Sequence, residues 1–173
     1  MDKQIIRKAI LKQRKLLSKD AIEAKSTQVI KQLIPYLKEY KCIAIYMACN
    51  GEVDLSPLLR LDYDFVIPRV ERNEMNFYQY HHDQLIESSF HILEPTNTIK
   101  IKKEQIDCMI IPLVAFDLNK NRIGYGKGYY DRYLHKHDFK TIGVAYDFQQ
   151  VERIPLDQFD IPLDMIITET LVK

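Results

Sequence analysis

The stretch Arg122-Ile-Gly-Tyr-Gly-Lys-Gly-Tyr-Tyr-Asp-Arg132 contains three of the five glycines in this 173-residue chain. Glycine tolerates positive φ and lets another group approach the backbone closely. Two arginines, a lysine and one carboxylate surround these glycines. Cationic side chains, free backbone N–H donors and a carboxylate in so short a segment suit a polyphosphate and its metal ion. Gly124–Gly128, called the glycine loop below, is therefore a candidate phosphate site.

The glycine loop lies between an apolar segment and a helical one. Residues 107–111 are predicted to form a buried strand, and a helix is predicted to start at the loop and end near Lys136. In sheets of parallel strands, ligands bind beyond the carboxyl ends of the strands, where this loop would lie. The other predicted strands are 42–46, 65–67 (halted at Pro68), 75–80 (with one face in water), 141–146 and 165–168.

Two longer helices are predicted before the first strand. One covers residues 2–16, and the second runs from an N-cap at Ser18 to about Tyr40, with Pro35 kinking it or ending it early. Short apolar strands that alternate with helices indicate an α/β fold. We expect one domain over residues 1–173, with a three-layer Rossmann-like arrangement of a mainly parallel central sheet flanked by helices.

Composition narrows the classes of function. The formal net charge is +1, which does not favour broad affinity for nucleic acid. No apolar run has the length of a membrane span, and the first residues lack the apolar stretch of a signal peptide. Three cysteines, Cys42, Cys49 and Cys108, fit neither a zinc site nor a disulfide framework. A cytoplasmic protein without membrane or nucleic-acid partners is expected.

The glycine loop has a purely structural interpretation as well. A glycine-rich turn could serve only to pack Tyr125, Tyr129 and Tyr130. The spacing matches neither a P-loop nor the dinucleotide-binding pattern. For alternating glycines alone we would favour the structural interpretation; with Lys127, two arginines and Asp131 around them, we favour phosphate. The five histidines show no metal-ligand spacing.

Residues 122–132 resemble the signature of the 5-formyltetrahydrofolate cyclo-ligase family, whose members are also called 5,10-methenyltetrahydrofolate synthetases. The resemblance extends along the chain through shorter segments. Lys3-Gln-Ile-Ile-Arg7 is similar to the N-terminal Lys-x-x-x-Arg of the family, and Tyr46-Met-Ala-Cys-Asn-Gly-Glu52-Val-Asp54 to a segment that ends in Glu-Val. Leu163-Asp-Met-Ile-Ile-Thr-Glu169 resembles the C-terminal segment.

The resemblance implies an ATP- and Mg²⁺-dependent enzyme that converts 5-formyltetrahydrofolate to 5,10-methenyltetrahydrofolate and releases ADP and phosphate. In such a reaction the formyl oxygen is phosphorylated, nitrogen 10 closes the ring, and phosphate leaves. Lys127, Arg122 and Tyr129 are the implied catalytic residues. The implied ATP-binding residues are Lys3, Gln4, Ile5, Ile6, Arg7, Arg122, Ile123, Gly124, Tyr125, Gly126, Lys127, Gly128, Tyr129 and Tyr130.

The resemblance also implies a folate site and a metal site. Met47 and Glu52 would hold the folate, together with Tyr125, Gly126, Lys127, Gly128 and Tyr129, because both substrates meet at the glycine loop. Asp131 and Asp164 are the implied Mg²⁺ positions, and the protein would be a monomer. Without the resemblance, Lys3 and Arg7 would be read as a solvated basic face, Glu52 as an exposed loop acid, Met47 as core and Asp164 as a cap or surface carboxylate.

Two other classes of function stay open at the level of sequence. One is a non-catalytic nucleotide-binding protein that has kept the phosphate loop, against which Glu52 and Asp131 argue. The other is a sugar-phosphate isomerase or an acyl-CoA-type enzyme on a similar scaffold, which the fold alone does not exclude. Such an enzyme would not need ATP or the pair Lys3 and Arg7.

Overall fold

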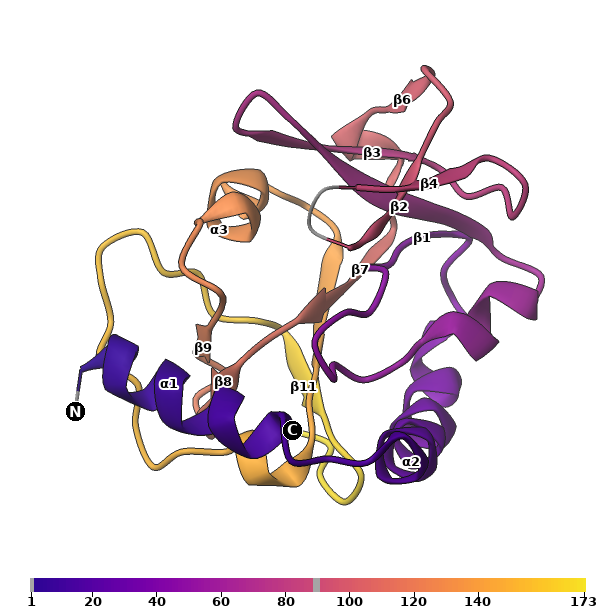
Figure 1. The fold of residues 1–173 in the computed structure, drawn as a ribbon. Coiled ribbons are helices and arrows are strands. Elements are labelled where there is room, and N and C mark those ends of the chain that lie inside the picture. Colours follow the sequence, from indigo (N-terminus) through magenta and orange to yellow (C-terminus); the bar gives the residue numbers. More distant parts are fainter. Residues whose placement is uncertain (1, 89–90) are drawn as a thin grey trace.

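The computed structural model describes residues 2–88 and 91–173, and its centre is a mixed sheet of seven strands in the order β11-β10-β7-β1-β2-β3-β6 (Figure 1). The first five strands of that order run parallel, and β3 and β6 are added antiparallel at one edge. The strands are β11 (Met165–Ile167), β10 (Lys140–Val144), β7 (Cys108–Pro112), β1 (Cys42–Ala44), β2 (Asp64–Glu71), β3 (Glu74–Gln79) and β6 (Lys100–Ile101).

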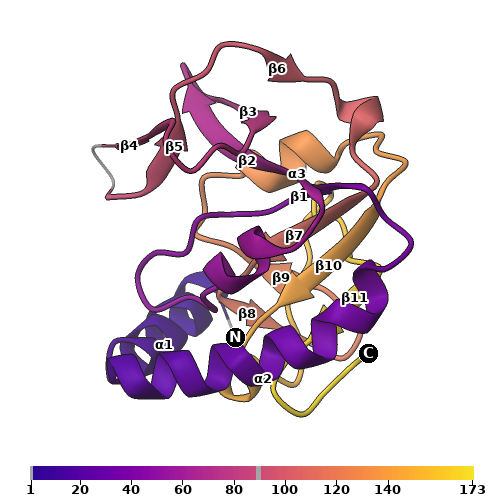
Figure 2. The ribbon, with the colours of Figure 1, turned by 90° about the vertical axis from the view of Figure 1, so that its right-hand side faces the viewer.

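One face of the sheet is covered by α2 (Lys19–Leu37), from whose side Figure 2 is viewed. The hydroxyl of Ser18 accepts a hydrogen bond from the Ala21 N–H at 3.2 Å and caps the helix, as predicted. Pro35 does not stop the helix, which continues to Leu37. The apolar stripe of α2 packs on inward side chains of β1, β2, β7 and β10 in one buried cluster; it includes Val29, Leu33, Leu37, Ile43, Ile45, Phe65, Ile67, Ile110 and Val144.

The opposite face is covered by the short helix α3 (Tyr129–Leu134), which follows the glycine loop (Figure 1). Its aromatic residues pack on the sheet, and the ring centroids of Tyr133 and Phe77 are 4.9 Å apart. The prediction of an α/β fold with a mainly parallel sheet is thus confirmed. The three-layer Rossmann-like arrangement is not confirmed, because the crossovers β1–β2 and β10–β11 use the 3-10 turns η1 (Ser56–Arg60) and η3 (Asp147–Gln149) instead of α-helices.

The first helix, α1 (Lys3–Arg14), packs away from the sheet and against a small hairpin. Ile6 and Ile10 form a third apolar cluster with β8 (Ala115–Phe116) and β9 (Arg122–Ile123). These two strands follow β7 directly and end at the glycine loop. The packing therefore holds α1 beside the glycine loop, beyond the carboxyl end of β7 (Figure 1).

Two details of the predicted strands are wrong. Pro68 does not halt β2, which continues to Glu71. The neighbour β1 pairs only with residues 64–66, so beyond that point the missing N–H of Pro68 interrupts no ladder. The strand at 75–80 has no wet face, because Met75–Tyr78 are all buried between α3 and the polar side chains around Arg69.

Several short elements were not predicted. They are the hairpin of β4 (Leu85–Glu87) and β5 (Leu93–Pro95), the 3-10 turn η2 (Lys103–Gln105), and the strands β6, β8 and β9. Over residues 2–88 and 91–173, no helix combines the length and apolar character that a membrane span requires.

Candidate active site at the glycine loop

The glycine loop adopts a conformation that requires glycine at two of its positions. Gly126 and Gly128 have φ of +93° and +68°, a region that side-chain-bearing residues rarely enter. Gly128 caps α3, and a Cβ placed on it would lie 2.9 Å from Nη1 of Arg132. Gly124, in contrast, has open space where a Cβ would stand. The loop therefore leaves its backbone accessible at the side where Gly124 lies.

Of the two cationic side chains of α1 that were predicted to bind ATP, Arg7 contacts the glycine loop and Lys3 contacts another segment. The Nε of Arg7 donates to the carbonyl oxygen of Gly124 at 2.8 Å, and its guanidinium carbon would be 3.4 Å from a Cβ on Gly126. Lys3, one turn earlier, forms ion pairs with Asp157 at 2.7 Å and with Asp160. In this structure the Lys3 ammonium is thus neutralised by two carboxylates of the segment that precedes β11.

Arg122 and Asp131 form a second charged group beside the loop. The Nη2 of Arg122 donates to Oδ1 of Asp131 at 2.7 Å, and its Nη1 donates to the carbonyl oxygen of Ile161 at 2.5 Å. Arg122 is 8 % exposed, so this pair is shielded on the arginine side. Lys127 is exposed, and its backbone carbonyl accepts from Arg132 at 2.9 Å. The ion pair of Arg122 and Asp131 therefore shapes the loop. Within the loop itself, the Lys127 side chain is exposed to solvent.

The two residues predicted for Mg²⁺ lie in different segments. Asp131 is beside the glycine loop, whereas Asp164 precedes β11 and accepts hydrogen bonds from the backbone N–H and hydroxyl of Thr141, both at 2.9 Å, at the amino ends of β10 and β11. Asp164 also pairs with Lys140 at 3.6 Å, whereas Asp160 pairs with Lys3 of α1. Among the described residues, no three His, Cys, Asp or Glu side chains form a group that could hold a metal.

Glu52, the residue predicted to bind the folate, is buried and not an exposed loop acid. It is 5 % exposed and follows the carboxyl end of β1. Its Oε2 accepts from the backbone N–H of Cys49 at 2.9 Å. Burial raises the pKa of the Glu52 carboxyl, and this rise is opposed by the Cys49 N–H, by a hydrogen bond from Tyr125 and by the charge of Arg14.

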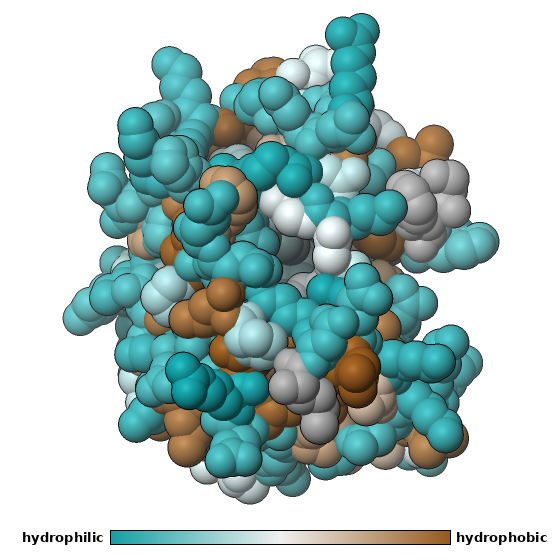
Figure 3. Space-filling view, turned by 90° about the vertical axis from the view of Figure 1, so that its left-hand side faces the viewer, coloured by the Kyte–Doolittle hydropathy of each residue, from teal (hydrophilic) through white to brown (hydrophobic). Residues whose placement is uncertain are grey.

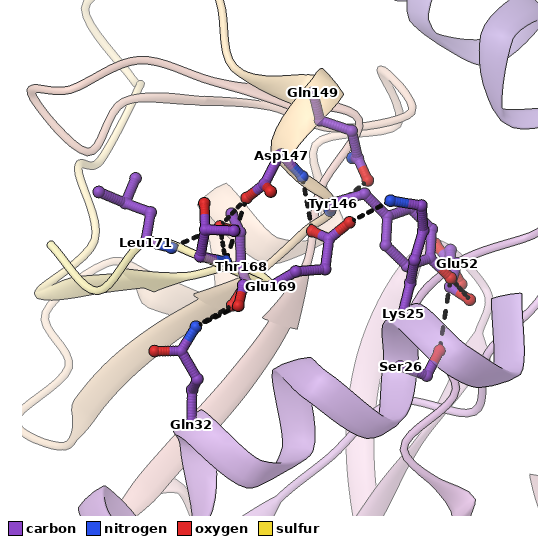
Figure 4. Close-up of polar contacts among 11 residues, drawn as sticks. Lys25, Ser26, Gln32, Glu52, Tyr146, Asp147, Gln149, Thr168, Glu169 and Leu171 are labelled. Carbon is purple, nitrogen blue, oxygen red and sulfur yellow. Dashed lines mark hydrogen bonds and ion pairs between the residues drawn. The ribbon is translucent and has the colours of Figure 1, made fainter. Parts of the chain in front are cut away.

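The backbone around Glu52 is fixed from the other side by the polar network in Figure 4. The hydroxyl of Tyr146 donates to the Glu52 carbonyl at 3.0 Å. Ser26 of α2 lies 3.4 Å from that hydroxyl and accepts the N–H of Asp54 at 2.9 Å. These contacts join α2 and the end of β10 to the Glu52 segment, so that the carboxylate has a defined position.

The same network continues to the C-terminal segment. Glu169 is 8 % exposed and pairs with Lys25 of α2 at 2.6 Å, while its second oxygen accepts the N–H of Asp147 at 2.7 Å (Figure 4). Gln32 donates to the carbonyl oxygens of Thr168 and Glu169 at 2.9 and 2.6 Å. Hydrogen bonds and an ion pair therefore hold the C-terminal segment against α2, on the same face of the sheet as Glu52.

The remaining predicted residues are divided between surface and core. Met47 is half-buried and lines a cleft of about 360 Å³ together with Tyr46 and Asp54. Ile6 and Ile123 are buried in the cluster beneath α1, so their side chains serve packing. Gln4 and Ile5 are exposed on α1, and Tyr129 and Tyr130 pack partly into the sheet.

Three residues at the site were missed by the sequence analysis: Arg14, Asp157 and Asp160. Arg14 is 2 % exposed, and its Nη1 donates to the Tyr125 hydroxyl at 2.7 Å. It lies seven residues after Arg7 on the same helix, hence on nearly the same face, which is the signal that could have found it. For the two aspartates only the fold reveals the contact with Lys3.

The face that carries α1 and α3 is mainly hydrophilic, with small apolar groups (Figure 3). It is hollowed near its middle, where residues of intermediate hydropathy lie at the surface. Such a surface suits a polar, charged ligand better than an apolar protein partner.

Comparisons with known proteins agree with this geometry. The model of the 5-formyltetrahydrofolate cyclo-ligase family matches residues 1–169. The 5-formyltetrahydrofolate cyclo-ligase of Mycoplasma pneumoniae is 33 % identical over 98 % of this chain and 99 % of that protein, and the Escherichia coli enzyme is 32 % identical over 75 % and 79 %.

Two solved structures are similar along nearly the whole chain. The 5,10-methenyltetrahydrofolate synthetase of Aquifex aeolicus superposes with a TM-score of 0.90 and 39 % identity, covering 100 % of this chain and 92 % of its own. That of Mycoplasma pneumoniae gives a TM-score of 0.81 with 32 % identity, covering 98 % and 99 %. The similarity thus includes α1, the Glu52 segment and the glycine loop together.

Proposed function

The chain belongs to the 5-formyltetrahydrofolate cyclo-ligase family of enzymes, and from this premise we propose that it uses ATP to convert 5-formyltetrahydrofolate into 5,10-methenyltetrahydrofolate, with release of ADP and phosphate. The observation that carries the proposal is the position of Arg7 on the glycine loop, with Lys3 beside it. The side chains of a solvated basic face would not form a hydrogen bond with that loop. A cationic helix face docked on an accessible backbone is suited to a triphosphate.

On the proposed mechanism, the formyl oxygen of the substrate attacks the γ-phosphorus and ADP leaves. Nitrogen 10 then adds to the activated formyl carbon, the ring closes, and the original formyl oxygen departs within phosphate. The protein positions the two substrates and neutralises charge, as in other phosphoryl transfers. Lys127, Arg122 and Tyr129 are the proposed catalytic residues, and Lys127 is the exposed cation of the loop.

Binding of phosphate by Lys3 requires its ammonium to exchange its present carboxylate partners for phosphate oxygens. In this structure the Lys3 ammonium is paired with Asp157 and Asp160. Phosphate oxygens of ATP would take their place at the ammonium. Asp160 would then be released from Lys3.

Mg²⁺ would enter this site bound to the phosphates of ATP. In nucleotide sites Mg²⁺ is commonly held by one or two carboxylates plus substrate phosphates, and a cage of three protein ligands is not required. Asp131 beside the loop, and Asp160 as the second carboxylate on the same side, would hold it. The metal would supply neutralisation of the phosphate charge. Asp164, which accepts from Thr141, stays a further proposed Mg²⁺ position.

Glu52 and Met47 are the proposed pterin contacts. A carboxylate accepts two parallel N–H bonds from a planar ring such as a pterin, and the buried setting of Glu52 strengthens such bonds. Met47 lines the adjoining cleft, where its soft side chain can pack against a flat ring. Tyr125 bridges this side to the glycine loop, so that the formyl end would lie at the loop.

A single assay tests the function. The purified protein is mixed with 5-formyltetrahydrofolate, and the absorbance of the methenyl product is followed with and without Mg-ATP. We expect product and equimolar ADP only in the presence of Mg-ATP. ATP binding without product would instead identify a non-catalytic nucleotide-binding protein, and product without ATP would contradict the phosphorylation step.

Compartment and assembly complete the proposal. We propose a cytoplasmic monomer with a single domain, in keeping with three cysteines that are all unpaired. Light scattering after size-exclusion chromatography would test the monomer, and a mass of twice 20.5 kDa would contradict it.

A further inference from the structure

Arg14, in the last turn of α1, is among the most deeply buried side chains of the described residues. Its Nη1 donates to the Tyr125 hydroxyl at 2.7 Å, and its Nη2 donates to the carbonyl oxygen of Leu113 at 2.6 Å. Gly51 lies against its stem, where a Cβ would be 3.1 Å from Cγ of Arg14. The Arg14 side chain thus connects α1, the end of β7 and the glycine loop through its guanidinium, and it contacts the Glu52 segment through its stem.

Stability alone does not account for this arginine. Within the described part of the chain, its Nε is buried without a hydrogen-bond partner. Burying a cation with an unsatisfied donor costs free energy, and an apolar side chain of similar volume is often as stable or more stable at such a position. The charge and the fork of donors therefore point to a role beyond packing.

Glu52 also interacts with Tyr125, whose hydroxyl accepts from Arg14 at 2.7 Å. Burial raises the pKa of the Glu52 carboxyl, whereas the positive charge of Arg14 opposes that rise. The carboxylate and the guanidinium are thus joined through one phenol hydroxyl in a shielded part of the protein. Without the arginine, burial would favour the neutral acid, which offers one acceptor fewer to a pair of ring N–H groups.

The other titratable groups that face Glu52 are neutral near pH 7. Cys49 precedes it in its own segment, Tyr46 lies two residues after β1, and Tyr130 lies on α3. Burial raises the pKa of each of these three groups, to about 12 for the Cys49 thiol. Arg14 consequently supplies the positive charge on this side of Glu52.

We propose that Arg14 is a positioning residue, which keeps Glu52 in its charged form and turns the Tyr125 hydroxyl inward for binding of the pterin. The inference rests on the proposed function, in which Glu52 accepts the ring N–H groups. It adds that the helix which carries Lys3 and Arg7 also prepares the folate site through its last turn. Docking of α1 would then be a condition for both substrates.

The test uses Arg14→Gln, with Lys12→Gln on the exposed face of the same helix as the matched control. The pH midpoint at which the Glu52 carboxyl titrates is measured first, by NMR of isotope-labelled glutamate carboxyls in the protein without substrates. The Glu52 signal is assigned by its loss in Glu52→Gln. We expect the midpoint to rise in Arg14→Gln and to stay unchanged in the control. The KM for 5-formyltetrahydrofolate should rise about tenfold for each pH unit below the new midpoint and should return to the wild-type value well above it, with kcat unchanged.

The two measurements separate the inference from the function on which it rests. An unchanged Glu52 midpoint in folded Arg14→Gln would overturn the role of Arg14, whatever the activity. A raised midpoint with a KM independent of pH would support the effect on Glu52 but overturn the assignment of Glu52 to the pterin. If Arg14→Gln does not fold, Arg14→Lys retains the charge and should leave the midpoint near that of the wild type; a raised midpoint there would contradict the proposal.

Discussion

At the scale of single residues, the proposed phosphate-binding role of Lys127 makes a direct prediction. It lies between two glycines of positive φ and is exposed at the loop. Lys127→Ala should raise the KM for ATP and lower kcat, by roughly tenfold or more in kcat/KM, because a charge-assisted hydrogen bond contributes about 1.5–3 kcal/mol. Steady-state kinetics check this, with Lys12→Ala as a control expected to change neither constant. Equal effects of the two substitutions would remove the phosphate role.

Glu52 supports a second prediction at this scale. Glu52→Gln replaces an acceptor by an amide that can accept only one of two ring N–H groups, so the KM for 5-formyltetrahydrofolate should rise by roughly tenfold to a hundredfold. The KM for ATP should stay within about twofold. Kinetics with each substrate varied in turn measure both, and Glu23→Gln on the exposed side of α2 serves as control. An unchanged folate KM would refute the assignment.

Elements differed in how well the sequence predicted them. The long α2 and the apolar strands β1, β7 and β10 carry their signal within their own residues, and the structure has them where expected. The strands β6, β8 and β9 have two residues each, and their pairing depends on distant partners that no local pattern shows. The burial of Met75–Tyr78 was missed for the same reason, since α3 and Arg69 cover it from elsewhere in the chain.

The glycine loop offers a test at the level of the element. Gly128→Ala places a side chain at φ +68° and 2.9 Å from Nη1 of Arg132, which should cost about 1–2 kcal/mol. Gly124→Ala meets open space and no positive φ, so it should leave the free energy of unfolding nearly unchanged. Denaturant titrations of both variants measure the difference.

The same two variants, Gly128→Ala and Gly124→Ala, separate an effect on stability from an effect on substrate binding. If substrates approach the backbone at Gly124, the added methyl group should raise the KM for ATP although the protein is as stable as the wild type. A Gly124→Ala enzyme with normal stability and a normal KM would show that the glycine serves the turn and not the ligand. Only the first outcome agrees with close approach of phosphate to the loop.

At the scale of the whole molecule, the candidate site comes together only when the sheet is assembled. Arg7 comes from α1, Glu52 from the segment after β1, and Asp160 from the segment before β11. The sequence predicted the first two because each lies in a recognisable motif. It predicted the second metal carboxylate at Asp164, which accepts from Thr141, whereas the contact of Asp160 with Lys3 is visible only in the fold. Arg14 and its contact with Tyr125 likewise required the fold.

One carboxylate outside the proposed site, Glu71, should influence the stability of the entire fold. Glu71 at the end of β2 accepts from the Tyr78 hydroxyl at 2.7 Å, from Arg69 at 2.7 Å and from Asn76 at 3.1 Å. The hydrogen bond from Tyr78 and those from Arg69 and Asn76 lower the pKa of Glu71 to about 2. The cluster joins the two strands that carry the antiparallel edge of the sheet, so its loss weakens the fold as a unit.

The sign of the pH effect follows from that lowered pKa. A carboxyl with a lower pKa in the folded state stabilises the protein above its unfolded pKa and loses this contribution as the pH falls toward the folded value. Glu71→Gln should therefore be less stable than the wild type near pH 6, and the difference should shrink between about pH 5 and about pH 2. Urea titrations at several pH values measure it, with the exposed Glu74→Gln of the same hairpin as control. If the difference in the free energy of unfolding stays constant with pH, the stabilisation does not come from the ionised Glu71, because the carboxylate takes up its proton in this pH range.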